Sequence, residues 1–253
     1  MQDVRQRWLG VAAALRWRPE WRITVAVAFA WIALLATHEH RYDGHVGLTQ
    51  GAAQGLQPGS AGLLAGLPGW ALMAVAMMGP VTLPAVRHVG FNSIRRRRQW
   101  AMTLYFAVSM GVWVVFGVLV LAGERVARET LGLDRRVLLT LALVVAAGWQ
   151  LTHIKRRALF RCRRTVPLPP VGLRADAACA RFALQQGWRC VTSCWALMAV
   201  MPAVGHADHA GLVWMAALTA PVMGEELTRL GRRLLRASAV ALIAAAGLVA
   251  LGV

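Results

Sequence analysis

The feature that most constrains the fold of this chain is a series of long apolar segments that recurs from residue 22 to the C-terminus. The segments approach the length of about 20 apolar residues that a helix needs to cross a bilayer. Charged residues make up only 15% of the chain and hydrophobic residues 58%, against about 25% charged in a soluble domain. A water-soluble protein of this composition could not cover its surface with polar groups. We therefore predict an all-α, polytopic transmembrane helix bundle.

The apolar segments predict about seven spans, so that residues 22–253 form a single transmembrane domain. Residues 1–21 are basic, with apolar side chains at helical spacing, which indicates a helix lying on the inner leaflet. We expect the first span to be retained rather than cleaved as a signal peptide, because its basic part is long and no cleavage motif follows it. The expected spans cover residues 22–37, 62–86, 100–122, 137–154, 188–204, 210–226 and 237–253.

The basic residues alternate between the two sides of this topology. Of the 28 Lys and Arg residues, 23 fall in the N-terminal segment and in the second, fourth and sixth loops. Cytoplasmic loops carry the excess of Lys and Arg, so we expect a multi-pass protein of the bacterial inner membrane with its N-terminus inside and its C-terminus outside. The largest basic loop, at about 155–187, is then cytoplasmic. No charged residue is expected within a span, which argues against proton-coupled transport.

The net charge of +17 is explained by this topology, because basic loops contact the anionic cytoplasmic leaflet. No stretch alternates basic and aromatic residues, so we expect the lipid bilayer and no nucleic acid as a partner.

Histidines gather in two of the outer loops. His38, His40 and His45 follow the first span, while His206 and His209 lie between the fifth and sixth. Imidazoles beside carboxylates suit divalent first-row metals. If the two loops meet above the bundle, they form a shared metal site. The alternative is that short polar loops simply contain such residues.

The cysteines lie on the inner side. Cys190 and Cys194 are one helical turn apart, so their thiols share a face and can bind a soft metal such as Cu(I) or Zn. Cys162, in the basic loop, is a third candidate ligand. The reducing cytoplasm disfavours a disulfide. The alternative is that these cysteines are small buried hydrophobes.

Two methionines extend the set of soft donors. Met77 and Met78 precede Pro80 in the second expected span. A thioether can bind soft metals, although packing is its commoner role. Glu225 and Glu226 are expected to end the sixth span at the inner surface, and no motif of a hydrolase accompanies them.

Three ordered stretches resemble a bacterial family of metal-binding integral membrane proteins, domain-of-unknown-function family 2182. Trp70, Met73 and residues 76–80 (AMMGP) are similar to its W..M..AMM.P signature. Residues 150–163 (QLTHIKRRALFRCR) and 187–198 (GWRCVTSCWALM) are similar to its Q.T..K..CL..CR and G..C.GCCW.LM segments. The resemblance implies membrane topology and metal binding. Ala158 and Ser193 stand where the family has cysteines, so three of the family's thiols remain, at Cys162, Cys190 and Cys194.

These observations give two hypotheses. In the first, the protein binds a transition metal of the copper or zinc class and transports it across the inner membrane, with outer histidines, a Met-lined core and inner cysteines in sequence. In the second, it is a non-catalytic subunit that docks on a membrane protein partner. We do not expect an enzyme, because no catalytic motif is present.

Overall fold

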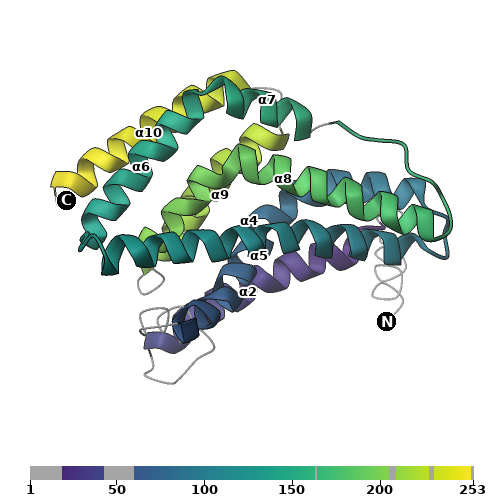
Figure 1. The fold of residues 1–253 in the computed structure, drawn as a ribbon, viewed down its shortest axis with the longest axis horizontal. Helices are drawn as coiled ribbons and strands as arrows, with labels where there is room; N and C mark the ends of the chain where they lie inside the picture. The colour runs from purple at the N-terminus through teal and green to yellow at the C-terminus, as the bar shows by residue number, and fades with distance from the viewer. Residues whose placement is uncertain (1–18, 43–59, 163, 205–208, 228–230, 252–253) are drawn as a thin grey trace, which may run out of the picture.

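The computed structural model describes residues 19–42, 60–162, 164–204, 209–227 and 231–251. Within these residues all regular secondary structure is α-helical, which confirms the predicted fold class. Figure 1 shows the helices packed along and across one another in a single bundle. They are α2 (Trp21–Tyr42), α4 (Ser60–Asn92), α5 (Arg98–Glu129), α6 (Arg135–Leu151), α7 (His153–Cys162), α8 (Leu173–Val204), α9 (His209–Leu227) and α10 (Gly231–Leu251).

Several of the described helices have the length and composition of membrane spans. Three qualify alone, namely residues 66–92 of α4, the whole of α5 and residues 234–251 of α10. The α6–α7 pair also qualifies as one broken span, bent by 70°. Helices suit a bilayer because every backbone hydrogen bond is made within the segment. The number of spans, predicted as seven, stays a prediction.

The core forms where α4, α8 and α9 meet. In Figure 1, α9 lies between the α6–α10 pair and the layer made by α4, α5 and α8. Side chains of α9 belong to one buried cluster that includes Met77, Leu143, Leu197, Met215 and Leu242. Since these five residues come from five helices, the cluster ties the whole bundle together.

A proline inside α4 is compensated by a tryptophan from α2. Pro80 has no backbone N–H, so it cannot donate to the carbonyl of Ala76 one turn earlier. The indole Nε1 of Trp31 donates to that carbonyl at 3.0 Å. An unpaired buried carbonyl is costly, and the contact therefore explains how α4 keeps a proline in its buried centre.

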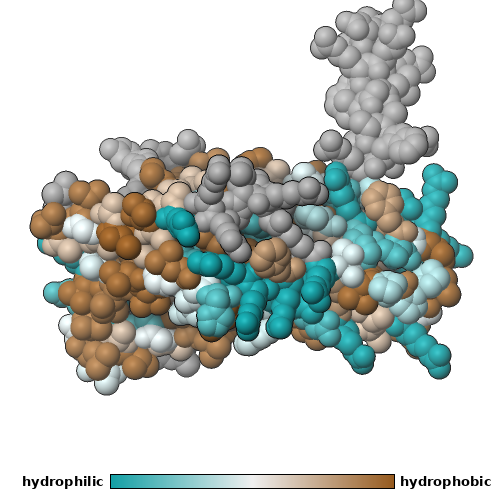
Figure 2. Space-filling view, turned by 90° about the horizontal axis from the view of Figure 1, so that it is seen from above, coloured by the Kyte–Doolittle hydropathy of each residue, from teal (hydrophilic) through white to brown (hydrophobic). Residues whose placement is uncertain are grey.

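The surface of the bundle changes in character along its length. Figure 2 shows apolar side chains over α6 and α10, and hydrophilic side chains towards the opposite end. Large apolar residues are exposed on these two helices, including Leu141, Val144, Val240 and Ile243. Exposure of this kind fits lipid contact, because lipid acyl chains are as apolar as the side chains of a protein core.

The region expected to be a basic loop is largely helical. The expected span at 137–154 ends at Leu151, and the chain turns sharply into α7. Helix α8 begins at Leu173, about 15 residues before the expected span at 188–204. Both additions carry arginines, so hydropathy alone did not reveal them. The connection between them, residues 164–172, is the part that remains irregular.

The expectation that charged side chains avoid the helical interior was wrong. Lys155 of α7 and Glu225 of α9 are fully buried, and Glu226 is 8% exposed. The two carboxylates were expected at the inner surface. The physical reason is that α7, which was not predicted, packs against α8 and approaches α9, and Lys155 supplies the partner for Glu225.

Candidate metal centre

Two thiols and one carboxylate converge in the interior of the bundle. The sulfur atoms of Cys190 and Cys194 and a carboxylate oxygen of Glu226 lie within 4.8 Å of one another, and all three side chains are buried. The cysteines are adjacent because α8 places residues four apart on one face, and α9 brings Glu226 to that face. A metal about 2.3 Å from each thiolate, the Zn–S distance, sets the sulfurs at most about 4.6 Å apart. The spacing therefore fits one ion with little rearrangement.

Ser193 links the carboxylate to the thiols. Its hydroxyl lies 2.7 Å from Glu226 Oε1, 2.9 Å from the carbonyl of Cys190 and 3.3 Å from the Cys194 sulfur. Ser193 is completely buried. The hydroxyl thus holds the Glu226 carboxylate beside the thiols, at the position where the resemblance to family 2182 expects a cysteine.

A buried ion pair lies next to this cluster. Lys155 Nζ is 2.6 Å from Glu225 Oε2, and both side chains are fully buried. Gln150 and Ser238 donate to the other carboxylate oxygen at 3.0 and 2.9 Å. The pair and its hydrogen bonds join α6, α7, α9 and α10. Because such a network fixes the position of α9, it also fixes Glu226, the next residue.

A pocket reaches the cluster from the surface. It has a volume of about 300 Å³, and its lining includes Cys162, Cys190 and Glu226. Cys162, at the end of α7, is partly exposed, whereas Cys190 is 5% and Cys194 1% exposed. Cys162, the third candidate cysteine, therefore lies near Cys190 and Cys194 and is closer to the surface than either of them. The exposed residues Arg164 and Thr165 also line the pocket, so the pocket is open at that side.

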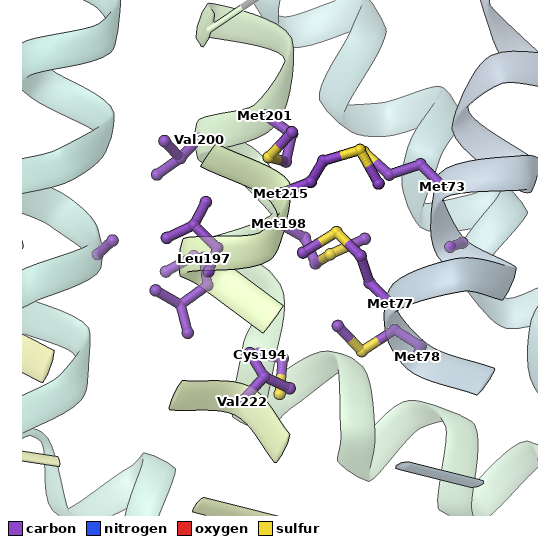
Figure 3. Close-up of a cluster of buried hydrophobic side chains, with 14 of the residues drawn as sticks. Met73, Met77, Met78, Cys194, Leu197, Met198, Val200, Met201, Met215 and Val222 are labelled. Atoms are coloured by element: carbon purple, nitrogen blue, oxygen red, sulfur yellow. The ribbon is translucent and has the colours of Figure 1, made fainter. Parts of the chain in front are cut away.

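Methionines lie on the other side of Cys194. Figure 3 shows Met77 and Met78 of α4 in a group with methionines of α8 and α9, and Cys194 at one end of the group. None of these methionines is more than 2% exposed, and they are Met73, Met77, Met78, Met198, Met201 and Met215. The group is a continuous part of the core, so packing accounts for it. The same group also puts thioether sulfurs next to the Cys194 thiol.

The predicted outer site cannot be compared with the structure. His45 and His206 lie outside the described residues. His38 and His40 fall in the last turns of α2 and His209 begins α9, but their side chains are also outside the described part. The shared histidine site stays a prediction.

One member of the cluster was missed by reasoning from the sequence. Glu226 was placed at the inner surface because it follows an apolar run and precedes Arg229. A signal was present, since two consecutive carboxylates at the end of a span are costly without partners. Lys155 and Ser193 are those partners, and only the packing of α7 and α8 reveals them.

Fold and site together define a helical membrane-associated protein with a buried, sulfur-rich group of potential metal ligands. A family model described as a copper chaperone, PpoB2, matches residues 67–249. The chain belongs to this family. The match covers α5 to α9 completely and most of α4 and α10, and it supports the metal-related character of the resemblance, although under a different family name. No curated protein and no solved structure matches the chain.

Proposed function

We propose that this protein is a membrane-embedded Cu(I) chaperone whose cargo binds to Cys190, Cys194 and Glu226. The observation that carries the proposal is the convergence of these three ligand atoms within 4.8 Å in a buried site. Copper is the cargo here, and the protein provides the ligands. The family description, copper chaperone, supports copper over other soft metals.

The donor set suits monovalent copper. Thiolate and thioether ligands favour Cu(I) and, for thiolates, Zn. Hard ligands are limited to one carboxylate in the described cluster, and the adjacent methionines offer thioethers, which zinc uses little. Two thiolates and a carboxylate carry three negative charges, so a bound Cu(I) leaves the site anionic. This charge favours a cation and opposes release into the apolar core.

Release of the cargo has two possible directions in this proposal. The methionine group that begins beside Cys194 offers a path of weak, neutral ligands, with Met78 towards the Cys194 end of the group in Figure 3. Movement along it, which has to overcome the charge of the site, would make the protein a transporter across the inner membrane. The pocket leads the other way, to a partner protein on the cytoplasmic side. The second route corresponds to a partner subunit without transport.

The proposal predicts one Cu(I) ion per chain that depends on the buried cysteines. Purified protein in detergent, under anaerobic reducing conditions, should retain one Cu(I) against a chromophoric chelator. The double variant Cys190→Ser/Cys194→Ser should retain none, because a serine hydroxyl is a poor ligand for a soft ion. Copper is measured by atomic emission after removal of unbound metal.

Cys179→Ser is the matched control on the same helix. The Cys179 thiol is 2% exposed and donates to the carbonyl of Ala101 at 3.4 Å. Cys179 is not a member of the Cys190–Cys194–Glu226 cluster and packs in a separate buried group with Phe182 and Ala183. The control should bind copper as the wild type does. Full binding by the double variant would show that the proposed site is wrong.

A further inference from the structure

The pocket beside the metal centre contains polar groups that the metal centre does not need. The Tyr105 hydroxyl and the Gln186 side-chain oxygen are buried, and neither has a hydrogen-bond partner among the described residues. Both residues line the pocket, and Tyr105 is fully buried. An unsatisfied buried polar group is destabilising. Two such groups in the wall of one cavity are available to a polar ligand once a small side-chain movement uncovers them.

The charge and size of the pocket restrict this ligand. Arg164 at the exposed side provides a fixed positive charge for a carboxylate. Gln186 uses its side-chain nitrogen to donate to the carbonyl of Cys162, so its oxygen is oriented as an acceptor for an N–H group. A volume of about 300 Å³ admits a small molecule or a peptide end and excludes a folded domain.

The position of Cys162 connects the pocket with the thiols. Its side chain lies at the end of α7, partly exposed, in the lining that also contains Cys190 and Glu226. An ion arriving in the pocket therefore meets Cys162 before it reaches the more deeply buried Cys194. The segment that carries Arg164 is held in place by His88, whose Nε2 lies 2.9 Å from the carbonyl of Val166.

From this geometry we infer that the pocket binds a Cu(I) complex of a small anionic thiol that has amide groups, and that Cys162 takes the ion first. This inference rests on the proposed Cu(I) site. The exchange needs no oxidant, since copper stays Cu(I) throughout. A bond forms between copper and the Cys162 sulfur, the bond between copper and the carrier sulfur breaks, and the Cys162 proton leaves on the carrier as its thiol. Cys190 then takes the ion by the same exchange and returns a proton to Cys162, and Cys194 completes the site as its own proton leaves to water in the pocket.

The test compares two copper donors in stopped-flow loading of the purified full chain. Cu(I)–glutathione serves as the anionic thiol probe, and Cu(I)–acetonitrile as a donor with no thiol and no carboxylate. With the glutathione complex, the wild-type rate should saturate with donor concentration. Arg164→Ala and Tyr105→Phe should raise the half-saturating concentration by about tenfold, corresponding to about 1.4 kcal/mol. With the acetonitrile complex, both variants should load at the wild-type rate.

Cys162→Ser tests the order of transfer. It should lower the maximal loading rate from Cu(I)–glutathione while the final copper content stays near one ion per chain. Arg174→Ala, an exposed arginine of α8 outside the pocket lining, is the charge control. Wild-type loading kinetics in Cys162→Ser, Arg164→Ala and Tyr105→Phe would overturn the inference. The final copper content of Cys190→Ser/Cys194→Ser tests the proposed function instead, because this variant should bind no copper. Failure of the inference and failure of the proposed function therefore give different results.

Discussion

At the scale of single residues, Ser193 decides how many thiols the centre can offer. Its hydroxyl stands 3.3 Å from the Cys194 sulfur and 2.7 Å from Glu226. A hydroxyl contributes little to a soft ion directly, so here it acts on the carboxylate. In the proposed function, the site is consequently a two-thiol centre with a hard third ligand, which suits a chaperone that must also release its cargo.

Replacing Ser193 with cysteine should tighten copper binding. Ser193→Cys puts a third sulfur within the buried cluster with nearly the same volume, and thiolates bind Cu(I) more strongly than hydroxyls. We expect the dissociation constant for Cu(I) to fall by about tenfold or more, equivalent to at least about 1.4 kcal/mol. Competition with a chromophoric Cu(I) chelator measures it.

Ser193→Ala separates the two effects of this position. It removes the hydroxyl that holds Glu226 without adding a sulfur, so affinity should fall below that of the wild type. An unchanged or weaker affinity in Ser193→Cys would mean that the 193 side chain does not face the bound ion.

The sequence predicted the thiols of the centre and not their surroundings. Cys190 and Cys194 were identified by helical spacing, a local property, and the structure places both in the interior on one face. Glu226 meets them, and the Ser193 hydroxyl, only through the packing of α9 on α8, which joins residues 33 apart. No periodicity within one helix carries that information.

At the scale of helices, the break between α6 and α7 brings the charged side chain of Lys155 into the interior of the bundle. The 70° bend at Thr152 directs α7 inward, and Lys155 follows within one turn. Hydropathy predicted a span through this region because residues 137–151 are apolar. The burial of Lys155 escaped prediction because its partner, Glu225, lies on another helix 70 positions later.

Loss of Lys155 alone should be strongly destabilising. Lys155→Met removes the ammonium group from the fully buried Glu225 carboxylate, and breaking a buried pair in this way costs about 3–5 kcal/mol. We expect a lower midpoint of thermal unfolding in detergent, followed by circular dichroism at 222 nm. Copper affinity should fall as well, because Glu226 loses its fixed position.

The double variant Lys155→Met/Glu225→Gln is the matched partner. It removes both charges and keeps the volumes similar, and neutral replacements of buried pairs are often close to neutral in stability. Its midpoint should return towards that of the wild type. If the double variant is as unstable as Lys155→Met, the pair is not the source of the stability.

At the scale of the whole molecule, the distribution of basic residues predicts orientation. The structure confirms a helical bundle with helices fit to cross a bilayer. The bias of 23 basic residues against 5 acts during membrane insertion, so a cellular experiment tests the topology directly.

A reporter fused after Val253 should be periplasmic. Alkaline phosphatase, which is active only outside the cytoplasm, should be active at this position. The same reporter fused after Arg97, between α4 and α5, should be inactive, because this loop lies on the basic side. Green fluorescent protein fusions should give the reverse pattern. Equal phosphatase activity at both positions would contradict the predicted orientation.

The ion pair of Lys155 and Glu225 also constrains how the protein is made. Synthesis delivers α7 to the membrane long before α9, since about 70 residues separate the two charges. During that interval the ammonium group has no carboxylate beside it, and a lone charge in lipid is costly. We therefore expect the nascent α6–α7 segment to wait at the headgroups or within the translocon until α9 emerges. Completion of the C-terminal helices, rather than insertion of each helix on its own, is then the step that closes the bundle.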